Sequence, residues 1–526
     1  MKRILILAAA LLSAACAEAP QPEINVIPRP LSVEQGDGAF RLGRSCPIGY
    51  DDPALQSVAA LCAGYLTEEG ERKPVVADKP VHKGIDLQLD DTLAGEEYTL
   101  SATKKGVSIC GGSPRAVLYG VQTLRQLIDG DRVPVVEIRD EPYFGYRGAM
   151  FDVARYFYPV EEVKRFIDIM ALHKLNTFHW HLTDDQGWRI EIERYPELTR
   201  IGSQRRETLI GHYKTSDEYD GKPHGGYYTQ DEIREVVAYA AERCIDIIPE
   251  IELPGHSMAA LASYPWLGCT KGPYEVRTTW YYSSDVLCAG RETTFEFLEN
   301  VLTEVIGLFP SKYIHVGGDE CPKVRWKACP DCQRRMRREG LADEDALQSY
   351  FVCRIEEWLH AHGREMIGWD ELLEGGVTPS TIVMSWRGTE GGIEAAKLGN
   401  RVIMAPRFYF YLDYYQTSDP ERNGEPLSIG RNVPIRKLYG YDPFDRLDEA
   451  QSRNILGVQA NLWTEYISTM DHAEYMLLPR LAAMSEVAWA TERRDYDDFV
   501  RRLGSLRGLY DREGYRYADF VFRGIE

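Results

Sequence analysis

Two adjacent acids, Asp319 and Glu320, follow a short apolar run at residues 312–316 and a pair of glycines. The run predicts a buried strand, and Gly317 and Gly318 allow the backbone to approach a ligand closely. Neighbouring carboxyl groups repel each other, so one is driven toward holding a proton at neutral pH. A protonated acid beside an ionised one is what general-acid catalysis requires. The plainer alternative is a solvated acidic pair after a strand.

Length and composition restrict the remaining possibilities. A chain of 526 residues is too long for one compact core and suits two or three domains. The hydrophobic share of 44% and the charged share of 27% are typical of a soluble globular protein. A net charge of −20 argues against nucleic acid or an anionic membrane as a partner. The 10 Trp and 32 Tyr form an aromatic surplus that suits stacking against sugars.

Residues 1–20 predict a targeting segment with a basic start and a short apolar run. Small residues before Cys16 are similar to a bacterial lipobox, in which the cysteine is lipidated. Ser13 occupies the place where a large aliphatic residue is usual, so ordinary cleavage near Ala15 or Ala19 stays open. We expect an exported protein of the periplasm or cell envelope, attached to the membrane only through a lipid at Cys16. No other stretch is long and apolar enough to span a bilayer.

Ten further cysteines follow Cys16. Export permits disulfides, but the sequence does not assign the pairs. Cys329 and Cys332 have the spacing of a zinc or redox motif, yet no second ligand pair follows at zinc-finger spacing. We therefore expect a disulfide or two free thiols there.

The periodicity of apolar residues divides the chain into two predicted domains. Residues 21–142 predict a small α+β domain with strands at 85–89, 98–101, 106–110 and 133–138 and a helix at 113–127. Residues 143–526 alternate strand and helix, which predicts a (β/α)₈ TIM barrel. The expected strands are 148–153, 177–182, 245–251, 313–316, 365–369, 382–386, 402–405 and 455–460. The expected helices are 160–173, 229–243, 293–308, 342–362 and a closing helix at 474–489, whereas 414–454 has a weak helical signal.

Charged and aromatic residues follow these strands at the same end. In a barrel the carboxyl ends of the strands and the loops after them build the active site. Core packing alone would not place such residues at one end of every strand, so the pattern predicts a shared polar cleft. Its candidates are Arg155, Asp184, His256, Asp319, Glu320, Trp369, Trp386, Tyr411, Asp413, Trp463 and Glu465.

The motifs carrying these residues resemble glycoside hydrolase family 20 β-N-acetylhexosaminidases of bacterial, exported lipoprotein type. The resemblance covers nearly all of the mature chain. It rests on six segments in the expected order: the His-Val-Gly-Gly-Asp-Glu segment at 315–320, with Trp-His-Leu-Thr-Asp-Asp-Gln at 180–186, Pro-Gly-His at 254–256, Trp-Asp-Glu at 369–371, Tyr-Leu-Asp at 411–413 and Leu-Trp-Thr-Glu at 462–465.

The resemblance implies an exo-acting, retaining hydrolase that removes terminal β-linked GlcNAc or GalNAc. Family 20 is an exception to the rule of two separated carboxylates, because the 2-acetamido oxygen of the substrate attacks the anomeric carbon and forms an oxazolinium ion. Glu320 is then the general acid and later the base. Asp319 accepts the acetamide N–H and stabilises the positive charge, and Tyr411 donates to the acetamide oxygen.

The other roles carried over by the resemblance concern binding. Trp369, Trp386 and Trp463 are expected to wall the pocket. Arg155, Asp413 and Glu465 are expected to hydrogen-bond ring hydroxyls. His256 and Asp184 are expected to support Glu320, with Asp185 as the alternative to Asp184. We expect no metal and no cofactor, and β-linked N-acetylhexosamine glycans as partners.

Two alternatives remain at this point. His179 and His181, with His256 or His315, could hold the metal of an amidohydrolase. A non-catalytic sugar-binding lipoprotein would be expected to lack the two acids, and both are present. The choice between GlcNAc and GalNAc, the natural glycan and the oligomeric state stay open.

Overall fold

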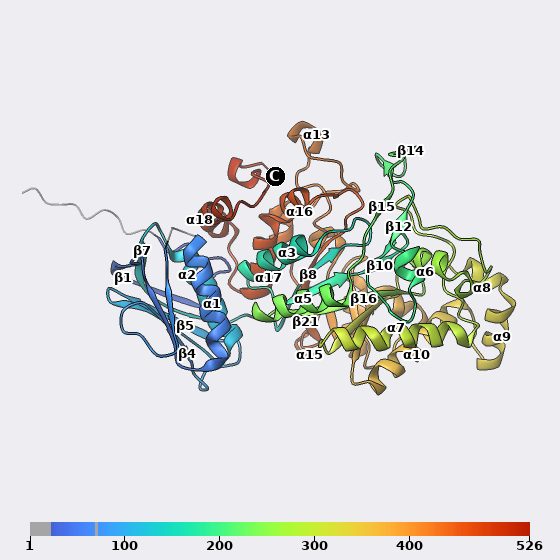
Figure 1. Cartoon of the computed structure of the whole chain (residues 1–526), viewed down its shortest axis with the longest axis horizontal. Helices are drawn as coiled ribbons and strands as arrows, with labels where there is room; N and C mark the ends of the chain where they lie inside the picture. The colour runs from blue at the N-terminus through green and yellow to red at the C-terminus, as the bar shows by residue number, and fades with distance from the viewer. Residues whose placement is uncertain (1–22, 69–71, 526) are drawn as a thin grey trace, which may run out of the picture.

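The structure is a computed structural model that describes residues 23–68 and 72–525. It consists of a small sheet domain followed by a larger barrel domain (Figure 1). The expected targeting segment and Cys16 lie outside the described residues. In the described part, no helix combines the length and the apolarity needed to cross a bilayer.

The first domain is a mixed sheet of seven strands in the order β1-β7-β5-β6-β4-β2-β3. Helices α1 and α2 lie on the side of the sheet that faces the barrel (Figure 1). The sequence predicted β4 to β7 and α2, but not α1 or β1 to β3. The bounds are β1 Ser32–Arg41, β2 Pro47–Tyr50, α1 Gln56–Glu68, β3 Val75–Ala77, β4 Ile85–Leu89, β5 Tyr98–Thr103, β6 Gly106–Gly111, α2 Pro114–Leu127 and β7 Arg132–Asp140.

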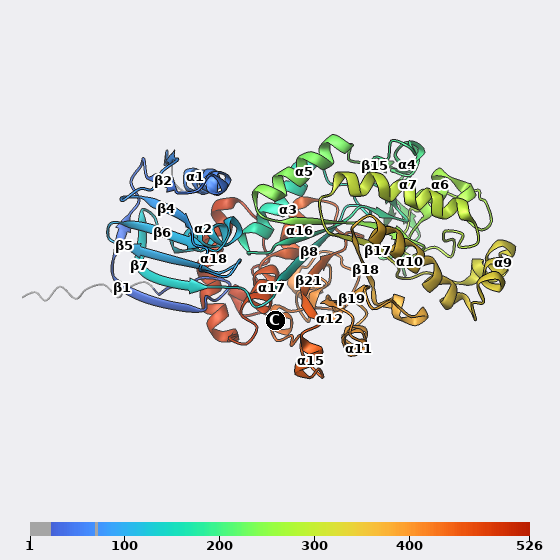
Figure 2. The same ribbon diagram turned by 90° about the horizontal axis from the view of Figure 1, so that it is seen from below.

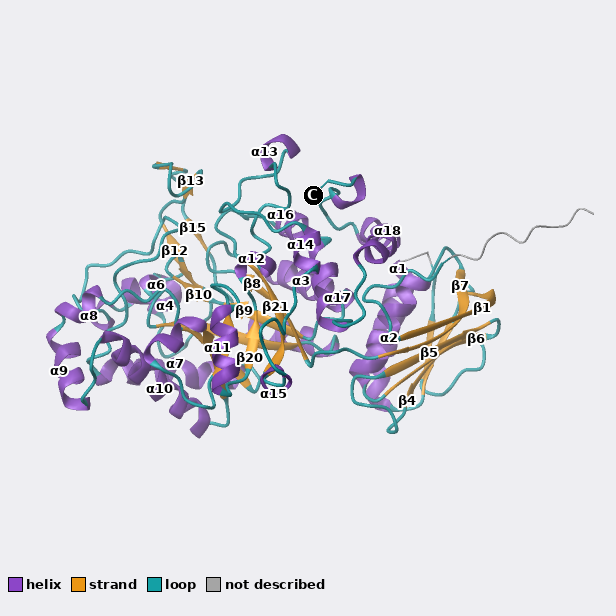
Figure 3. Cartoon of the chain, turned by 180° about the vertical axis from the view of Figure 1, so that it is seen from behind, coloured by secondary structure: helices purple, strands orange, loops and turns teal. Residues whose placement is uncertain are grey.

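The second domain is a closed barrel of eight strands, all paired in parallel (Figures 2 and 3). The expected (β/α)₈ barrel after a small α+β domain is therefore confirmed. Strand β18 has the predicted bounds, and the other strands differ from the prediction by a few residues at their ends. The strands are β8 Tyr146–Asp152, β9 Thr177–His181, β16 Asp246–Leu253, β17 Tyr313–Gly317, β18 Glu365–Trp369, β19 Ile382–Ser385, β20 Val402–Met404 and β21 Ile455–Leu462.

Amphipathic helices cover the barrel, and their apolar faces pack on its strands. Helix α5 begins at a capping box in which Thr229 and Glu232 satisfy each other's backbone N–H groups. Between β20 and β21 the chain forms only four short helices, as the weak helical signal predicted. The covering helices are α3 Val160–Leu172, α5 Gln230–Glu242, α7 Glu292–Leu308, α10 Glu344–Ala361 and α11 Glu390–Leu398, and the short ones are α12 Arg407–Phe410, α13 Pro420–Asn423, α14 Ile435–Tyr439 and α15 Glu449–Ser452.

The predicted closing helix at 474–489 is wrong as a single element. It is divided into α16, Met470–Leu477, and α17, Arg480–Trp489, with Pro479 between them. Proline has no backbone N–H and clashes with the preceding turn, so a helix does not continue through it. A further helix, α18 at Tyr496–Glu513, was not predicted.

The remaining elements are short and belong to loops. They are η1 Pro53–Leu55, β10 Thr183–Asp184, β11 Gly187–Trp188, α4 Glu197–Arg200, β12 Gln204–Arg205, β13 Leu209–Ile210, β14 Glu218–Tyr219, β15 His224–Gly225, α6 Met258–Ser263, η2 Pro265–Leu267, α8 Val324–Ala328, α9 Pro330–Glu339, η3 Asp370–Gly375 and η4 Val521–Arg523. Strands β10 to β15 and helix α4 lie between β9 and β16, and helices α8 and α9 follow the two adjacent acids.

The two domains share buried contacts. Trp489, at the end of α17, packs in the hydrophobic core of the first domain, and its indole N–H donates to Asp140 at 2.8 Å. The ammonium of Lys174 is wholly buried and donates to Tyr98, Thr123 and Asp140 at 2.9, 2.8 and 3.3 Å. Because each of these groups finds its partners in the other domain, the barrel and the sheet domain support each other.

Candidate active site

A pocket of about 280 Å³ opens at the carboxyl ends of the barrel strands. This volume is just below the usual range for ligand pockets, which is roughly 300–1,000 Å³. Two of the predicted site residues, Asp184 and Trp369, do not line it and lie behind its wall. The predicted residues that do line it are Arg155, His256, Asp319, Glu320, Trp386, Tyr411, Asp413, Trp463 and Glu465.

The turn after β17 positions the two adjacent acids. Gly317 and Gly318 have φ values of 67° and 98°, which side chains rarely adopt. A Cβ atom on Gly317 would overlap the Glu252 carboxyl group, so glycine is needed there for space as well. The side chain of Asp319 is only 11% exposed, whereas that of Glu320 is 36% exposed. The turn therefore directs one acid into the protein and leaves the other at the open side.

Asp319 has an environment that raises the pKa of its carboxyl group above the usual range. Burial raises its pKa to about 6, and the charges of Glu250 and Glu320 add to this while His256 opposes it. Its Oδ1 atom is buried and has no hydrogen-bond partner within the described protein. A buried acceptor without a partner at a pocket wall is available to a ligand.

His256 connects the two acids to a buried carboxylate. Its Nδ1 lies 3.0 Å from Oδ1 of Asp184, and its Nε2 lies 3.5 Å from Glu320 Oε2 and 3.6 Å from Asp319 Oδ2. Burial disfavours the imidazolium, but Asp184 and Asp319 outweigh burial and raise the pKa of His256 well above its usual range. A charged imidazole therefore faces both acids.

Asp184 and Asp185 have different surroundings. Asp184 also contacts Nη2 of Arg155 and Nε2 of His181, both at 3.0 Å. Asp185 lies 3.9 Å from His256, and its oxygens accept the backbone N–H groups of Met258 and Ser283, each at 3.0 Å. The geometry thus gives Asp184 the contact with His256 and gives Asp185 the role of holding a loop.

Aromatic side chains form one wall. Trp386 and Tyr411 stack with ring centroids 6.0 Å apart and planes 15° apart, and Trp463 lies 6.2 Å from Tyr411. The indole N–H of Trp386 donates to Glu371 at 2.7 Å, which fixes the ring. The indole N–H of Trp463 is buried without a partner in the described protein. The wall therefore combines flat apolar ring faces with one hydrogen-bond donor, the Trp463 indole N–H, that is available to a ligand.

Trp369 was predicted to wall the pocket, but it lies behind the residues that line it. Its side chain is fully buried, and its indole N–H donates to Glu250 at 2.9 Å. Its ring centroid is 6.1 Å from that of Trp463. Strand β18 ends at this residue with the side chain inside the barrel, so Trp369 supports the wall from behind.

The opposite end of the pocket is polar. Arg155 contacts Asp152 at 3.2 Å and extends over the ring of Trp463 at 4.8 Å. Burial and the nearby Glu465 raise the pKa of Asp413 well above its usual range, and burial raises the pKa of Glu465 to about 7. Oδ1 of Asp413 has no partner in the described protein. This group of one cation and two acids suits the hydroxyl groups of a sugar.

Several lining residues were missed by the sequence interpretation: Gln186, Tyr213, Trp280, Tyr281, Tyr282 and Arg407. The aromatic run at 280–282 was a signal in the sequence, but its loop belongs to no predicted element. Only the folded path of that loop brings these rings over the acids.

The histidines weighed as metal ligands are not brought into one site with an open face. His179 and His315 lie 3.0 and 2.7 Å from the Glu250 carboxylate, and His181 contacts the same carboxylate. All of these groups are fully buried inside the barrel. His256 instead pairs with Asp184, toward the pocket.

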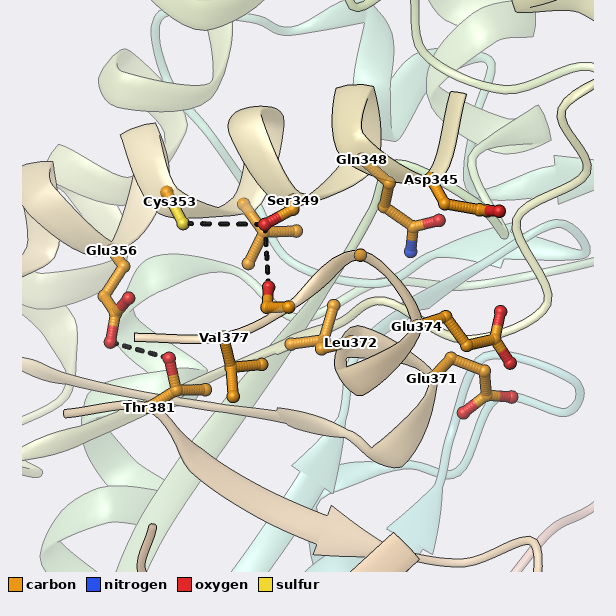
Figure 4. Close-up of a pocket in the computed structure, with 13 residues that line it drawn as sticks. Asp345, Gln348, Ser349, Cys353, Glu356, Glu371, Leu372, Glu374, Val377 and Thr381 are labelled. Carbon is orange, nitrogen blue, oxygen red and sulfur yellow. Dashed lines mark hydrogen bonds between the residues drawn. The ribbon is translucent and has the colours of Figure 1, made fainter. Parts of the chain in front are cut away.

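A second hollow lies between η3 and α10 and has a volume of only about 10 Å³ (Figure 4). Its polar groups bond to one another: Ser349 donates to the Gly376 carbonyl at 2.7 Å, and Thr381 donates to Glu356 at 3.0 Å. It has neither the space nor the unpaired groups of a sugar site.

A barrel with a small acid-containing pocket at the carboxyl ends of its strands is an architecture used by glycoside hydrolases. The model for the catalytic domain of glycosyl hydrolase family 20 matches residues 144–492, and the model for domain 2 of that family matches residues 23–141. The chain therefore belongs to glycosyl hydrolase family 20.

Individual relatives agree with this membership. The chain is 44% identical to a β-hexosaminidase of Porphyromonas gingivalis over 94% of its own length, and it spans 64% of the length of that protein. It is 39% identical to a β-hexosaminidase of Vibrio furnissii over 88% of the chain and 76% of that protein.

Solved structures match as well. The family 20 exo-β-N-acetylglucosaminidase of Vibrio harveyi, solved with N-acetylglucosamine, superimposes with a TM-score of 0.84 at 34% identity, covering 94% of this chain and 78% of that one. The Streptomyces plicatus N-acetyl-β-hexosaminidase in complex with thio-NAglucal gives 0.83 at 32% identity, covering 95% and 97%.

Proposed function

We propose that the protein is an exo-acting, retaining β-N-acetylhexosaminidase that removes terminal β-linked GlcNAc or GalNAc by substrate-assisted catalysis. The observation that supports this most directly is the adjacency of Asp319 and Glu320 on one turn, with only one of them at the open side of the pocket. Two neighbouring carboxylates do not flank a glycosidic bond at the roughly 5 Å that an enzyme nucleophile requires. The nucleophile is then the acetamide of the substrate.

In the first step the acetamide carbonyl oxygen attacks the anomeric carbon. The glycosidic C–O bond breaks, and Glu320 transfers its proton to the leaving oxygen. Asp319 accepts the acetamide N–H with its unpaired Oδ1 and stabilises the positive charge of the oxazolinium ion. Tyr411, at the aromatic wall, donates its hydroxyl to the acetamide oxygen.

In the second step a water molecule attacks the anomeric carbon from the face that the leaving group vacated, while Glu320 accepts a proton from it. The bond between the anomeric carbon and the acetamide oxygen breaks, and the acetamide group is restored. His256, charged and 3.5 Å from Glu320, stabilises the carboxylate form after each proton leaves it. Two inversions at the same carbon restore the β configuration.

The polar end of the pocket supports exo action. This end of the pocket has room for one sugar ring and is lined by Arg155, Asp413 and Glu465. Behind it, the ring of Trp463 packs against that of His181, with centroids 4.9 Å apart. Because buried side chains close this end, a chain of sugars extends only outward from the acids. The terminal non-reducing residue is then the one removed.

For location, we propose an envelope protein anchored by a lipid at Cys16. The sequence of the targeting segment supports this. Mass spectrometry of the native mature amino terminus should find an acylated cysteine, and a free terminus beyond residue 16 would mean simple export.

The reaction is tested by following an aryl β-N-acetylglucosaminide by proton NMR from the first minutes. The first product should be the β anomer, before mutarotation. An α anomer would overturn the substrate-assisted scheme. A matching aryl glucoside, which lacks the acetamide, is the control and should be hydrolysed far more slowly.

A further inference from the structure

Four cysteines from two distant segments meet beside the active-site loop. Cys269 and Cys288 belong to the loop between η2 and α7, and Cys329 and Cys332 belong to the start of α9. Sγ of Cys332 lies 3.8 Å from Cys269 and 3.7 Å from Cys288, and Cys288 lies 3.8 Å from Cys329. All four sulfur atoms lie within 4.8 Å of one another.

These separations decide between two kinds of cysteine site. A disulfide requires sulfur atoms about 2.0 Å apart. Four thiolates around a tetrahedral zinc ion, with Zn–S bonds of about 2.3 Å, have sulfur atoms about 3.8 Å apart. Three of the sulfur pairs, at 3.7 to 3.8 Å, match the edge of that tetrahedron. We propose that Cys269, Cys288, Cys329 and Cys332 bind a structural Zn²⁺ ion.

The surroundings of the four cysteines suit a charged metal–thiolate centre. Four thiols release four protons to water as four Zn–S bonds form, which leaves a net charge of −2. Cys329 caps the amino end of α9 and Cys332 lies in its first turn, where the helix dipole favours thiolates. Three of the four cysteines are buried and Cys269 is partly exposed, as expected of a closed structural site.

Neighbouring residues hold the two segments together around the cysteines. Arg291 donates to the Cys269 carbonyl at 3.3 Å and to Asp331, between the other two cysteines, at 2.7 Å. A Cβ atom on Gly290 would overlap the backbone of Asp331 and Cys332, so the absence of a side chain lets the loop reach the helix.

The metal would close the base of a loop that lines the pocket. Residues between Cys269 and Cys288 include Trp280, Tyr281 and Tyr282, which face the acids. The other two cysteines lie shortly after Glu320 in the chain. One ion therefore ties the aromatic loop to the segment that carries the acids, which is a positioning role separate from catalysis.

From the sequence, Cys329 and Cys332 were expected to form a disulfide or to stay as free thiols, because no second ligand pair follows at zinc-finger spacing. The structure places Cys269 and Cys288 beside them, and these two cysteines precede the pair at a separation that no zinc-finger pattern describes. The barrel brings consecutive loops together, and this places the two pairs of cysteines side by side. The spacing of the cysteines in the sequence does not reveal that contact.

The test measures the metal and the thiols of the full mature chain. Elemental mass spectrometry of protein purified without chelators should find about one zinc per chain. Intact mass under denaturing, non-reducing conditions should show the four cysteines as thiols. A mass lowered by two hydrogens for each bond within 269–332, with no metal, would overturn the proposal in favour of disulfides. Bound iron would overturn the choice of zinc.

The zinc content of cysteine variants tests where the ion is bound. Cys329→Ser and Cys332→Ser should lose the zinc, whereas the control Cys353→Ser, on α10 and outside the cluster, should keep it. Zinc retained at full stoichiometry in either cluster variant would overturn the site. If the variants do not fold, cobalt exchanged into the wild-type protein gives the same answer. The visible bands of a tetrahedral cobalt tetrathiolate support the site, and octahedral cobalt spectra contradict it.

Discussion

Nδ1 of His256 lies 3.0 Å from Oδ1 of Asp184, behind the two acids of the pocket. This contact turns the other ring nitrogen toward Glu320 and Asp319. A charge on Asp184 therefore acts on the two acids through the protonation of one imidazole.

Asp184→Asn should lower the pKa of His256 toward about 6.5, because its strongest favourable partner loses its charge. NMR titration of the imidazole measures this. Asp185→Asn is the matched control, since that carboxylate mainly accepts backbone N–H groups. A similar fall of the His256 pKa in both variants would contradict the distinction drawn between the two acids.

Glu320→Gln removes the transferable proton and keeps the shape of the side chain. We expect kcat/KM for a substrate with a poor leaving group to fall by roughly 10²–10⁴. An activated aryl substrate should lose much less, because its leaving group departs with little protonation. Glu449→Gln, a carboxylate on α15 whose side chain is 87% exposed, is the control. Equal losses with both substrates would rule out Glu320 as the acid.

Asp319→Asn should slow the reaction with both kinds of leaving group, by roughly 10²–10³, because stabilisation of the cationic intermediate is needed in each case. Azide should not restore turnover through a covalent enzyme route, since no enzyme carboxylate attacks the sugar. Turnover of the activated substrate near the wild-type rate, or a glycosyl ester trapped on Asp319, would show that the division of roles is wrong.

The raised pKa of Asp319 also predicts how stability depends on pH. The folded carboxyl has a pKa of about 6, against 3.8 for an unperturbed aspartic acid, so the folded state binds more protons between these two pH values. Its contribution to the free energy of unfolding is complete below pH 3.8 and is lost as the pH rises through 6. Asp319→Asn should therefore stabilise the protein at pH 8, on the order of 1–3 kcal/mol, and change little at pH 3.5.

Urea unfolding at the two pH values measures this difference. Asp285→Asn, a partly exposed acid paired with Arg325, is the control. A stabilisation by Asp319→Asn that is equal at both pH values would mean that the charge on Asp319 is not its cause.

The strands and the order of the motifs could be predicted because each depends on local sequence. Apolar runs such as 313–316 mark strands, and the polar residues after them share one end of the barrel by topology alone. How deeply a side chain is buried at the end of a strand could not be predicted in this way. Trp369 ends β18 and Trp386 follows β19, yet the first is buried against Glu250 and the second lines the pocket. That difference depends on neighbours from other strands, which no local pattern contains.

The paths of long loops were the other part of the structure that could not be predicted from the sequence. Trp280 and Tyr282 lie in a segment without regular structure, where periodicity carries no information. The break at Pro479 was visible in the sequence and was overlooked, because the apolar spacing continues on both sides of it.

The contacts of Lys174 and Trp489 across the two domains have a consequence for how this protein can be shortened or recombined. A fragment starting at residue 143 would leave the Lys174 ammonium without Asp140 and expose the indole that fills the first domain's core. An unpaired buried charge and an open apolar surface favour aggregation over solubility. The sheet domain thus covers this surface of the barrel and pairs its buried charge. Grafting the barrel onto another partner requires carrying that cover along or redesigning both residues.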